Sequence, residues 1–341
     1  MKVFVTGARG FLGRHVVESL RSRGVAVREL GRPEGDLRDP AIASHLLAGA
    51  DTIVHLAADV GGVGYLKSCP GRAFHDNFRL GLNVIKAACE HRVKRLILAG
   101  SPCAYSGDVP LPLREEFLDD GVPSGDTGTY GYAKMATSLA AKEWCGMHGV
   151  DTVTVIPSNL YGPGDRFEQD RGHVVAALLR KALLARAAGR PSFDVWGDGS
   201  ATRDFVYVTD VAEGIASVVV SDDSFDGEIF NLGSGRETSI HEIAGVIARE
   251  CGPNLWPEFL ADKPVGYTRR VMSIEKAAAA IGYHAATGLE EGIRTTVRWL
   301  SHNGFVDAWL AEAPAGRKAR RPRPSKVADP VGDRLSRSRA A

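Results

Sequence analysis

Reactive side chains gather in two short stretches of this sequence. In LAGSPCAYSG, residues 98–107, Ser101 and Cys103 follow directly after an apolar, strand-like run. About thirty residues later, Tyr130 and Lys134 stand four positions apart in TYGYAK, so one helical turn would place them on the same face. A nearby ammonium lowers the pKa of a phenol, which would make Tyr130 a proton donor or acceptor near neutral pH. We expect Ser101 at the same rim, hydrogen-bonding a substrate oxygen.

Cys103 admits two interpretations from the sequence. Free cysteine is among the most buried residue types, so Cys103 on its own could simply fill the core. Its place two residues after Ser101 instead favours a role in chemistry. A modest lowering of its pKa is enough for a cysteine thiol to ionise near neutral pH.

A glycine-rich loop predicts a dinucleotide site. TGARGFLG follows the first strand-like run and opens the first helical one, with Gly7, Gly10 and Gly13 three positions apart. Glycine permits the tight turn and lets backbone N–H groups approach a pyrophosphate, which a helix N-terminus also attracts. This strand–turn–helix context is the one that the dinucleotide fingerprint requires.

The second strand-like run bears on the choice between NAD and NADP. An NAD site usually places Asp or Glu at the end of that strand, to hold the ribose 2′-hydroxyl. Here Gly31 occupies that place and Arg32 follows, with Arg9 nearby in the glycine loop. Two guanidinium groups without a carboxylate favour a 2′-phosphate, hence NADP(H). In the alternative, Arg32 only solvates a loop, Glu29 holds the ribose and the cofactor is NAD.

The elements that must position these groups alternate along the first 160 residues. Short runs rich in Val and Ile are typical of buried parallel strands, namely KVFVTG, VAVREL, DTIVHLA, RLILAGS and TVTVIPS. Helical periodicity covers residues 10–23, 77–91 and 132–148 between them. This alternation predicts a doubly wound α/β parallel sheet of the Rossmann type, with ligands at the carboxyl ends of the strands.

The second half of the sequence is more mixed. Helical periodicity covers residues 173–188, 238–250 and 289–300, around the strand-like runs FDVWGDG, DFVYV and EIFNLGSG. We predict a Rossmann domain over residues 1–165 and about 204–235, a smaller α/β substrate-binding lobe over about 166–203 and 236–312, and a basic, disordered tail over 313–341.

Composition excludes several classes of protein. The net charge of +1 over 341 residues gives no reason to expect nucleic acid as a partner. The charge is uneven, since residues 317–341 hold nine Lys or Arg and two Asp or Glu. That tail is either an electrostatic arm or a solvated extension. Five scattered cysteines without a C-x-x-C pair predict neither a disulfide framework nor a metal site. Neither a signal peptide nor a membrane span is expected, so we expect a cytoplasmic protein.

The motifs together resemble a known family. Residues 1–310 are similar to the extended short-chain dehydrogenase/reductases, the NAD-dependent epimerases and dehydratases that act on nucleotide sugars. Within that family they most resemble the GDP-L-fucose synthases, with the GDP-mannose 3,5-epimerases next. The matching stretches are LAADVGGVG, GSPCAYSG, YGYAK, PSNLYGPGDRF, HVVAALLRK and VWGDGSATRDFVYVTD.

The resemblance implies a role for each matching residue. Ser101, Tyr130 and Lys134 would form the reductase triad, and Cys103 with His173 the pair that epimerises the sugar. The nucleotide-sugar site would include Ser101, Asn159, Lys181, Trp196, Arg203 and Arg270, with Arg203 at the diphosphate. The cofactor site would comprise Gly7, Arg9, Gly10, Phe11, Leu12, Gly13, Arg32, Asp36, Leu37, Leu56, Ala57, Ala58, Tyr130, Lys134, Pro157, Asn159, Leu160 and His173. A homodimer through paired helices is also implied.

Three residues depart from the family pattern. Pro102 stands where the family more often has serine, Lys181 where arginine is expected, and Ser273 where aspartate is expected. These differences concern the identity of the sugar more than the type of reaction.

The expected activity is 3,5-epimerisation and NADPH-dependent 4-keto reduction of a GDP-4-keto-6-deoxy-hexose. A redox-neutral nucleotide-sugar epimerase with tightly bound NAD is the alternative enzyme. A non-catalytic NADP-binding scaffold is the alternative from another class, and the intact set of Ser101, Tyr130 and Lys134 argues against it.

Overall fold

A six-stranded parallel sheet forms one half of the molecule. The computed structural model describes residues 1–168, 172–263 and 266–312. The strands lie in the order β10-β5-β4-β3-β1-β2. Their bounds are β1 (Lys2–Thr6), β2 (Ala26–Leu30), β3 (Thr52–His55), β4 (Arg95–Ala99), β5 (Asp151–Pro157) and β10 (Glu228–Leu232). β2 and β3 lie on opposite sides of β1, so the chain changes direction across the sheet at β1. Ligands of such sheets bind at this switch point, outside the carboxyl ends of the strands. The predicted doubly wound Rossmann fold is confirmed.

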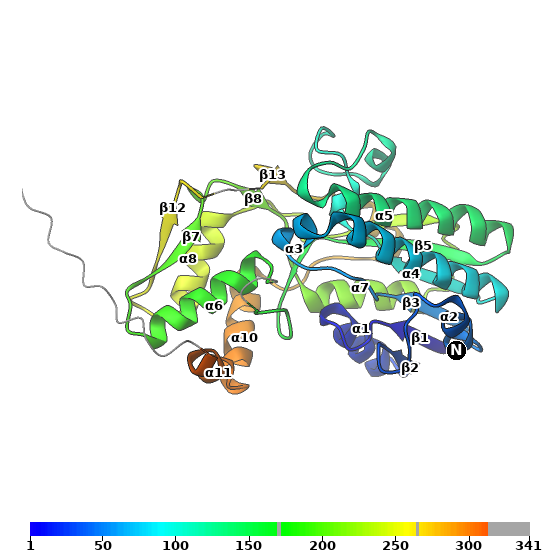
Figure 1. Ribbon diagram of the computed structural model, residues 1–341, viewed down its shortest axis with the longest axis horizontal. Coiled ribbons are helices and arrows are strands. Elements are labelled where there is room, and N and C mark those ends of the chain that lie inside the picture. The colour runs from blue at the N-terminus through cyan, green and yellow to red at the C-terminus, as the bar shows by residue number, and fades with distance from the viewer. Residues whose placement is uncertain (169–171, 264–265, 313–341) are drawn as a thin grey trace, which may run out of the picture.

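Helices cover both faces of this sheet (Figure 1). One face packs against α1 (Phe11–Ser22), α7 (Val208–Val220) and α9 (Glu275–Ile281). The other packs against α2 (Pro40–Leu47), α4 (Pro70–Glu90), α5 (Gly128–Ala140) and the π-helical turn η4 (Ala141–Cys145). Side chains alternate along each strand, so Val3 and Val5 enter one core and Phe4 the other. Both faces being buried explains why the strands read as nearly continuous apolar runs.

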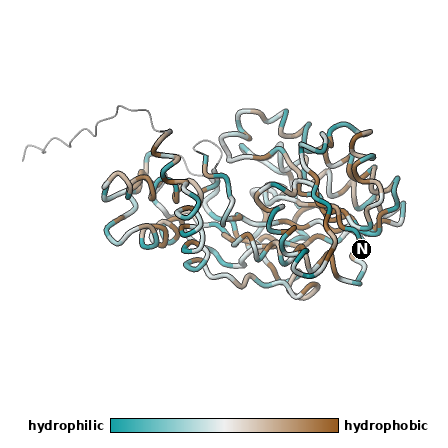
Figure 2. Tube along the Cα trace, turned by 90° about the horizontal axis from the view of Figure 1, so that it is seen from below, coloured by the Kyte–Doolittle hydropathy of each residue, from teal (hydrophilic) through white to brown (hydrophobic). Residues whose placement is uncertain are grey.

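The other half is a smaller lobe with its own core. Its helices are α6 (Val174–Ala187), α8 (Ile240–Cys251), α10 (Leu289–His302) and α11 (Phe305–Glu312). Its strands are β7 (Ser192–Trp196) paired with β12 (Trp256–Leu260), and β8 (Thr202–Arg203) between β11 (Thr238–Ser239) and β13 (Arg269–Arg270). Figure 2 shows hydrophobic segments within both halves and hydrophilic ones along the outer loops. Leu179, Phe193 and Ile247 are fully or almost fully buried in the core of the lobe.

Short elements join the halves where the strands end. β6 (Asn159–Tyr161) continues from β5 and pairs in parallel with β9 (Phe205–Tyr207). α3 (Val63–Ser68) and three single 3-10 turns complete this border: η1 (Pro102–Ala104), η2 (Glu115–Asp119) and η3 (Gly125–Thr127). Chain segments from both halves therefore meet around the carboxyl ends of β1, β3, β4 and β5.

Several details go beyond the sequence-based expectation. α4 begins at Pro70, seven residues before the predicted start, because proline suits the first turn of a helix, where its missing N–H is not needed. Ala277 and Tyr283 return to the core of the large sheet. Within the described residues, no helix is long and apolar enough to cross a membrane. The predicted tail, 313–341, lies outside the described residues.

Candidate active site

A cleft of about 1240 Å³ runs along the carboxyl ends of the strands and reaches the lobe. It is lined by every residue predicted for the cofactor, from Gly7 to His173, and by all five predicted catalytic residues. Asn159, Arg203 and Arg270 line it as well. The cleft thus brings together residues that are up to 263 positions apart in the chain.

The glycine loop is shaped as a cradle for a pyrophosphate. Gly7 has φ +68°, and a Cβ added there would lie 2.7 Å from the backbone nitrogen of Ala57. A Cβ at Gly13 would lie 2.1 Å from the carbonyl oxygen of Gly7. Side chains at these positions would fill the turn. Gly10 is the N-cap of α1 and provides no side-chain cap, so the first N–H groups of the helix remain available to an anion. The loop therefore fits a dinucleotide.

The structure corrects the prediction that no carboxylate lies beside Gly31. Glu34 folds back, so that its Oε2 accepts hydrogen bonds from the Gly31 N–H at 2.8 Å and from Arg9 Nη1 at 2.9 Å. This pairing lowers the pKa of Glu34 and raises that of Arg9. Arg32 is exposed and has no hydrogen-bond or ion-pair partner among the described residues. Glu29 pairs with Arg21 instead and does not line the cleft.

Asp36 and Leu37 line the same end of the cleft. Arg38 binds the carboxylate of Asp36 and lowers its pKa to about 2, so Asp36 is charged at neutral pH. Arg38 also donates to Asp76 at 2.7 Å, which ties this loop to α4. The Leu37 side chain is buried.

Tyr130 and Lys134 lie on the first turns of α5, where both line the cleft and are largely buried. Lys134 Nζ donates to the carbonyl oxygen of Ala99 at 2.8 Å and lies 5.9 Å from the centre of the Tyr130 ring. Burial lowers the pKa of Lys134 to about 8. The predicted lowering of the pKa of Tyr130 is wrong: burial raises this pKa, and the nearby Cys103 and Asp59 raise it further. Tyr130 is therefore held as a protonated phenol, a proton donor.

Cys103 lies in a tight turn that explains the unusual Pro102. Pro102 occupies the first position of η1, where its fixed φ suits the turn and a backbone N–H would have no partner. Ser101 is the N-cap, and its Oγ accepts a hydrogen bond from the Cys103 N–H at 3.2 Å. The turn packs closely on α5, because a Cβ at Gly131 would lie 1.9 Å from the carbonyl oxygen of Cys103. Ser101 and Cys103 thus reach the same cleft as Tyr130.

Arg270 fixes this turn from the lobe. Its Nη2 donates to the carbonyl oxygens of Pro102 at 2.9 Å and Tyr105 at 3.1 Å, and its Nη1 donates to that of Ser106 at 3.1 Å. Its guanidinium also stacks on the Tyr267 ring at 4.4 Å. Arg270 therefore holds the Cys103 turn in addition to lining the cleft.

Two partly buried arginines, Arg203 and Arg270, face the cleft without a carboxylate partner among the described residues. Burial lowers the pKa of Arg203, and the charge of Arg270 lowers it further. Burial also lowers the pKa of Arg270. Among the described residues, no carboxylate lies within ion-pair distance of either guanidinium; Arg203 donates only to the carbonyl oxygen of Thr202, at 2.7 Å. Such a pair favours a doubly charged anion, such as a diphosphate.

His173 enters the cleft from the N-cap position of α6, and its side chain is 45% exposed. Nδ1 lies 3.4 Å from Oδ1 of Asp165, a residue that sequence reasoning missed. Asp165 lies within PSNLYGPGDRF, so the motif itself contained the signal. Asp59, in LAADVGGVG, was also missed; its carboxylate accepts hydrogen bonds from the Tyr65 hydroxyl at 2.8 and 2.9 Å and faces the same cleft.

Lys181 and Trp196 do not line the cleft. Lys181 Nζ lies 5.4 Å from the centre of the Trp196 ring and donates to the carbonyl oxygen of Asp194 at 3.0 Å. The two predicted substrate residues thus contact each other on the lobe, and the Trp196 side chain is largely exposed.

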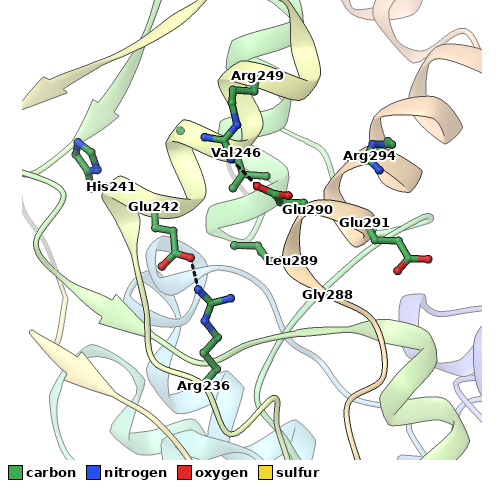
Figure 3. Close-up of a pocket in the computed structure, with 11 residues that line it drawn as sticks. Arg236, His241, Glu242, Val246, Arg249, Gly288, Leu289, Glu290, Glu291 and Arg294 are labelled. Carbon is green, nitrogen blue, oxygen red and sulfur yellow. Dashed lines mark hydrogen bonds and ion pairs between the residues drawn. The ribbon is translucent and has the colours of Figure 1, made fainter.

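A second pocket, of about 580 Å³, lies between α8 and α10 (Figure 3). Each arginine lining it pairs with a carboxylate: Arg236 with Glu242, Arg249 with Glu290, and Arg294 with Glu250. An anion entering this pocket would have to displace those carboxylates. We therefore place the candidate active site in the larger cleft.

Comparison with known proteins agrees with this geometry. A family model described as the NAD dependent epimerase/dehydratase family matches residues 3–233. A GDP-L-fucose synthase of Sinorhizobium fredii is 32% identical over 294 residues, which are 86% of this chain and 93% of that protein. GDP-L-fucose synthase 1 of Arabidopsis thaliana is 31% identical over 306 residues, 89% of this chain and 94% of that protein. A solved GDP-L-fucose synthetase of Naegleria fowleri, bound to NADP, superposes with a TM-score of 0.80 at 26% identity, covering 89% of this chain and 93% of that one.

Proposed function

Because the chain belongs to the NAD-dependent epimerase/dehydratase family, we propose that it is an NADPH-dependent epimerase/reductase of a GDP-linked 4-keto-6-deoxy-hexose. The observation that carries this proposal is the meeting of Cys103, His173 and Tyr130 in one cleft with the glycine loop. A simple reductase needs Tyr130 alone among these three, whereas inversion of a carbon centre needs an additional acid and base.

The cofactor would bind from the glycine loop to Lys134. Gly7, Gly10 and Gly13 would receive the pyrophosphate, because a side chain at these positions would collide with the neighbouring backbone of the turn. Arg9 and Arg32 would hold the 2′-phosphate, and Lys134 the nicotinamide ribose. When bound, NADPH supplies the hydride that reduces C4 of the sugar. The solved relative from Naegleria fowleri is bound to NADP, which supports this choice.

The epimerisation follows from the acidity of a 4-keto sugar. The carbonyl at C4 acidifies the hydrogens on C3 and C5, so a base can remove each as a proton. Cys103 takes the proton from one face, and His173 returns a proton to the carbon from the opposite face, which inverts the centre. Ser101 hydrogen-bonds the C4 oxygen and stabilises the enolate that forms between the two proton transfers.

The reduction uses a different group. Tyr130, which burial keeps protonated, donates its proton to the C4 oxygen as that oxygen becomes an alkoxide. Lys134 lies below the ring and stabilises the phenolate that remains. Arg203 and Arg270 would bind the diphosphate, since both are partly buried cations without a carboxylate partner among the described residues.

One observation supports a second candidate, a redox-neutral nucleotide-sugar epimerase with bound NAD. Glu34 places a carboxylate beside Gly31, where an NAD site has its acidic residue. However, Arg9 pairs with that carboxylate. Cofactor stoichiometry separates the two candidates. The proposed enzyme consumes one equivalent of NADPH per GDP-4-keto-6-deoxy-mannose, whereas turnover of GDP-mannose without added cofactor supports the second candidate.

We propose a homodimer through α4 and α5. Phe74, Phe78 and Leu82 stand four residues apart on α4, and the first and last of them are exposed. Leu139 on α5 is 61% exposed and Trp144, in the adjoining η4, is 52% exposed. A second copy covering both helices would bury these side chains. Sedimentation analysis tests this: a monomer at micromolar concentration contradicts it, and Leu139→Glu should dissociate a dimer.

A further inference from the structure

Asp165 is a buried carboxylate, and one of its oxygens has no partner in the described part of the chain. Its side chain is only 1% exposed, although the residue lines the cleft. Oδ1 accepts a hydrogen bond from the Arg166 N–H at 2.7 Å and lies 3.4 Å from His173 Nδ1. Oδ2 is buried and has no hydrogen-bond partner among residues 1–168, 172–263 and 266–312. Buried carboxylate oxygens normally have hydrogen-bond partners. An oxygen without one, at the edge of the candidate active site, therefore indicates that Asp165 has a function there.

The backbone fixes Asp165 and His173 independently of each other. Asp165 closes a turn after β6, in which its N–H donates to the carbonyl oxygen of Gly162 at 3.3 Å. Gly164 in that turn has φ +83°, a conformation that favours glycine. His173 holds the N-cap position of α6 with an extended backbone. The contact between the two side chains therefore joins two separately anchored segments, the end of the sheet and the start of a lobe helix.

We propose that Asp165 is the positioning residue of His173. The carboxylate accepts a hydrogen bond from Nδ1–H, which fixes the tautomer and the ring orientation and leaves Nε2 to serve the sugar. This inference rests on the proposed function, in which His173 delivers a proton to the sugar carbon.

The proton balance of the step is simple. The doubly protonated imidazolium loses the proton on Nε2; the N–H bond breaks, a C–H bond forms at the sugar carbon, and the electron pair of the former bond stays on Nε2. The Nδ1 proton remains on the ring throughout. Asp165 takes up no proton in this step, and its carboxylate stabilises the imidazolium before transfer.

A purely structural role is the competing explanation. Oδ1 also caps the Arg166 N–H, and a carbonyl oxygen of asparagine could do the same. Asp165→Asn therefore separates the explanations, because it keeps the shape and the capping acceptor while it removes the charge. The matched control is Glu168→Gln, which removes an exposed carboxylate from the same loop outside the cleft lining.

The experiment measures the two half-reactions separately in the full-length protein. Exchange of solvent deuterium into C3 and C5 of the 4-keto sugar reports the acid–base pair, and oxidation of GDP-L-fucose by NADP⁺ reports the hydride step alone. Asp165→Asn should lower the exchange rate by about 10- to 100-fold and leave GDP-L-fucose oxidation within about twofold. Glu168→Gln should change neither. In the double variant with His173→Asn, the Asp165 substitution should have no further effect.

The ring nitrogens give a readout besides activity. In the wild-type protein, ¹⁵N NMR at neutral pH should find the His173 imidazole protonated on Nδ1; the Nε2-protonated tautomer would overturn the proposal even if Asp165→Asn does not fold. Unchanged exchange in a folded Asp165→Asn would overturn it too, as would an equal loss of exchange and GDP-L-fucose oxidation. If the wild-type protein shows no exchange at all, it is the proposed function that fails, and the inference fails with it.

Discussion

Arg270 Nη2 donates a hydrogen bond to the carbonyl oxygen of Pro102 at 2.9 Å, across 168 positions of sequence. Arg270 belongs to β13 in the lobe, whereas Pro102 begins the turn that carries Cys103 at the end of β4. The same guanidinium faces the cleft beside Arg203. A single side chain thus links the proposed diphosphate site to the proposed base, so binding of the nucleotide and placement of Cys103 are coupled.

This coupling predicts different results for the two arginines. Arg270→Lys keeps the charge but cannot supply three hydrogen bonds from one planar group, so exchange at C3 and C5 should fall about tenfold or more and the KM for the GDP-sugar should rise. Arg203→Lys should raise the KM and leave the exchange rate at saturation within about twofold. Steady-state kinetics with deuterium exchange measures both. Equal effects of the two substitutions would contradict the coupling.

Substitutions at Cys103 and Tyr130 should separate the two reactions. Cys103→Ser should abolish exchange at C3 and C5 but leave GDP-L-fucose oxidation within about threefold, because the hydride step uses another group. Tyr130→Phe should lower that oxidation by about 10²- to 10⁴-fold and retain exchange. The measurement is proton NMR in D₂O beside NADPH absorbance. Exchange that survives in Cys103→Ser means that Cys103 is not the base.

The pKa of Lys134 predicts an alkaline limit for the hydride step. Burial lowers this pKa to about 8 from its ordinary value of 10.5, so Lys134 loses its charge as the pH rises through about 8. Because the ammonium supports Tyr130 and the ribose, kcat/KM for reduction should fall above pH 8. Lys134→Met should be slow and lack this limb; a limb that persists in the variant belongs to another group.

The lowered pKa of Lys134 also makes the free energy of unfolding depend on pH, in the direction opposite to that of the hydride step. Between about pH 8 and 10.5 the unfolded chain binds the lysine proton more tightly than the folded protein does. Lys134 therefore lowers the free energy of unfolding below pH 8, and that penalty is relieved as the pH rises towards 10.5. Urea denaturation at pH 7.5 and 9.5 should show Lys134→Met gaining its advantage over wild type mainly at the lower pH.

Cofactor preference should depend on the Arg9–Glu34 pair. Arg9→Ala should raise the KM for NADPH by about tenfold and change that for NADH little, because only NADPH carries a 2′-phosphate. Glu34→Gln should lower the KM for NADPH, since it frees Arg9 and removes a repelling charge. Kinetics with both cofactors test this. A protein that prefers NADH and loses that preference in Glu34→Gln is an NAD enzyme instead.

The sequence predicted those parts of the site that depend on local patterns. The short, nearly continuous apolar runs around Val3, Val54 and Ile97 are typical of buried parallel strands, and all three are strands in the structure. The turn at Gly7 and the one-turn spacing of Tyr130 and Lys134 are also local features, and both hold in the structure.

The contacts that it could not predict all depend on tertiary structure. Glu34 reaches Arg9 only because the loop after β2 folds back towards the glycine loop. The hydrogen bonds of Arg270 cross from a two-residue strand to a distant turn. The prediction for Lys181 rests on its sequence motif alone. A motif does not show whether a helix residue faces the cleft or, as here, the neighbouring Trp196.

In the proposed mechanism, one cleft performs both carbon-acid chemistry and hydride transfer. This mechanism is tested most directly by converting GDP-4-keto-6-deoxy-mannose with NADPH in D₂O and determining the product by NMR. We expect a sugar inverted at C3 and C5, with deuterium at both carbons and one NADPH oxidised per product. A reduced sugar that keeps protium and its original configuration at both carbons would contradict it.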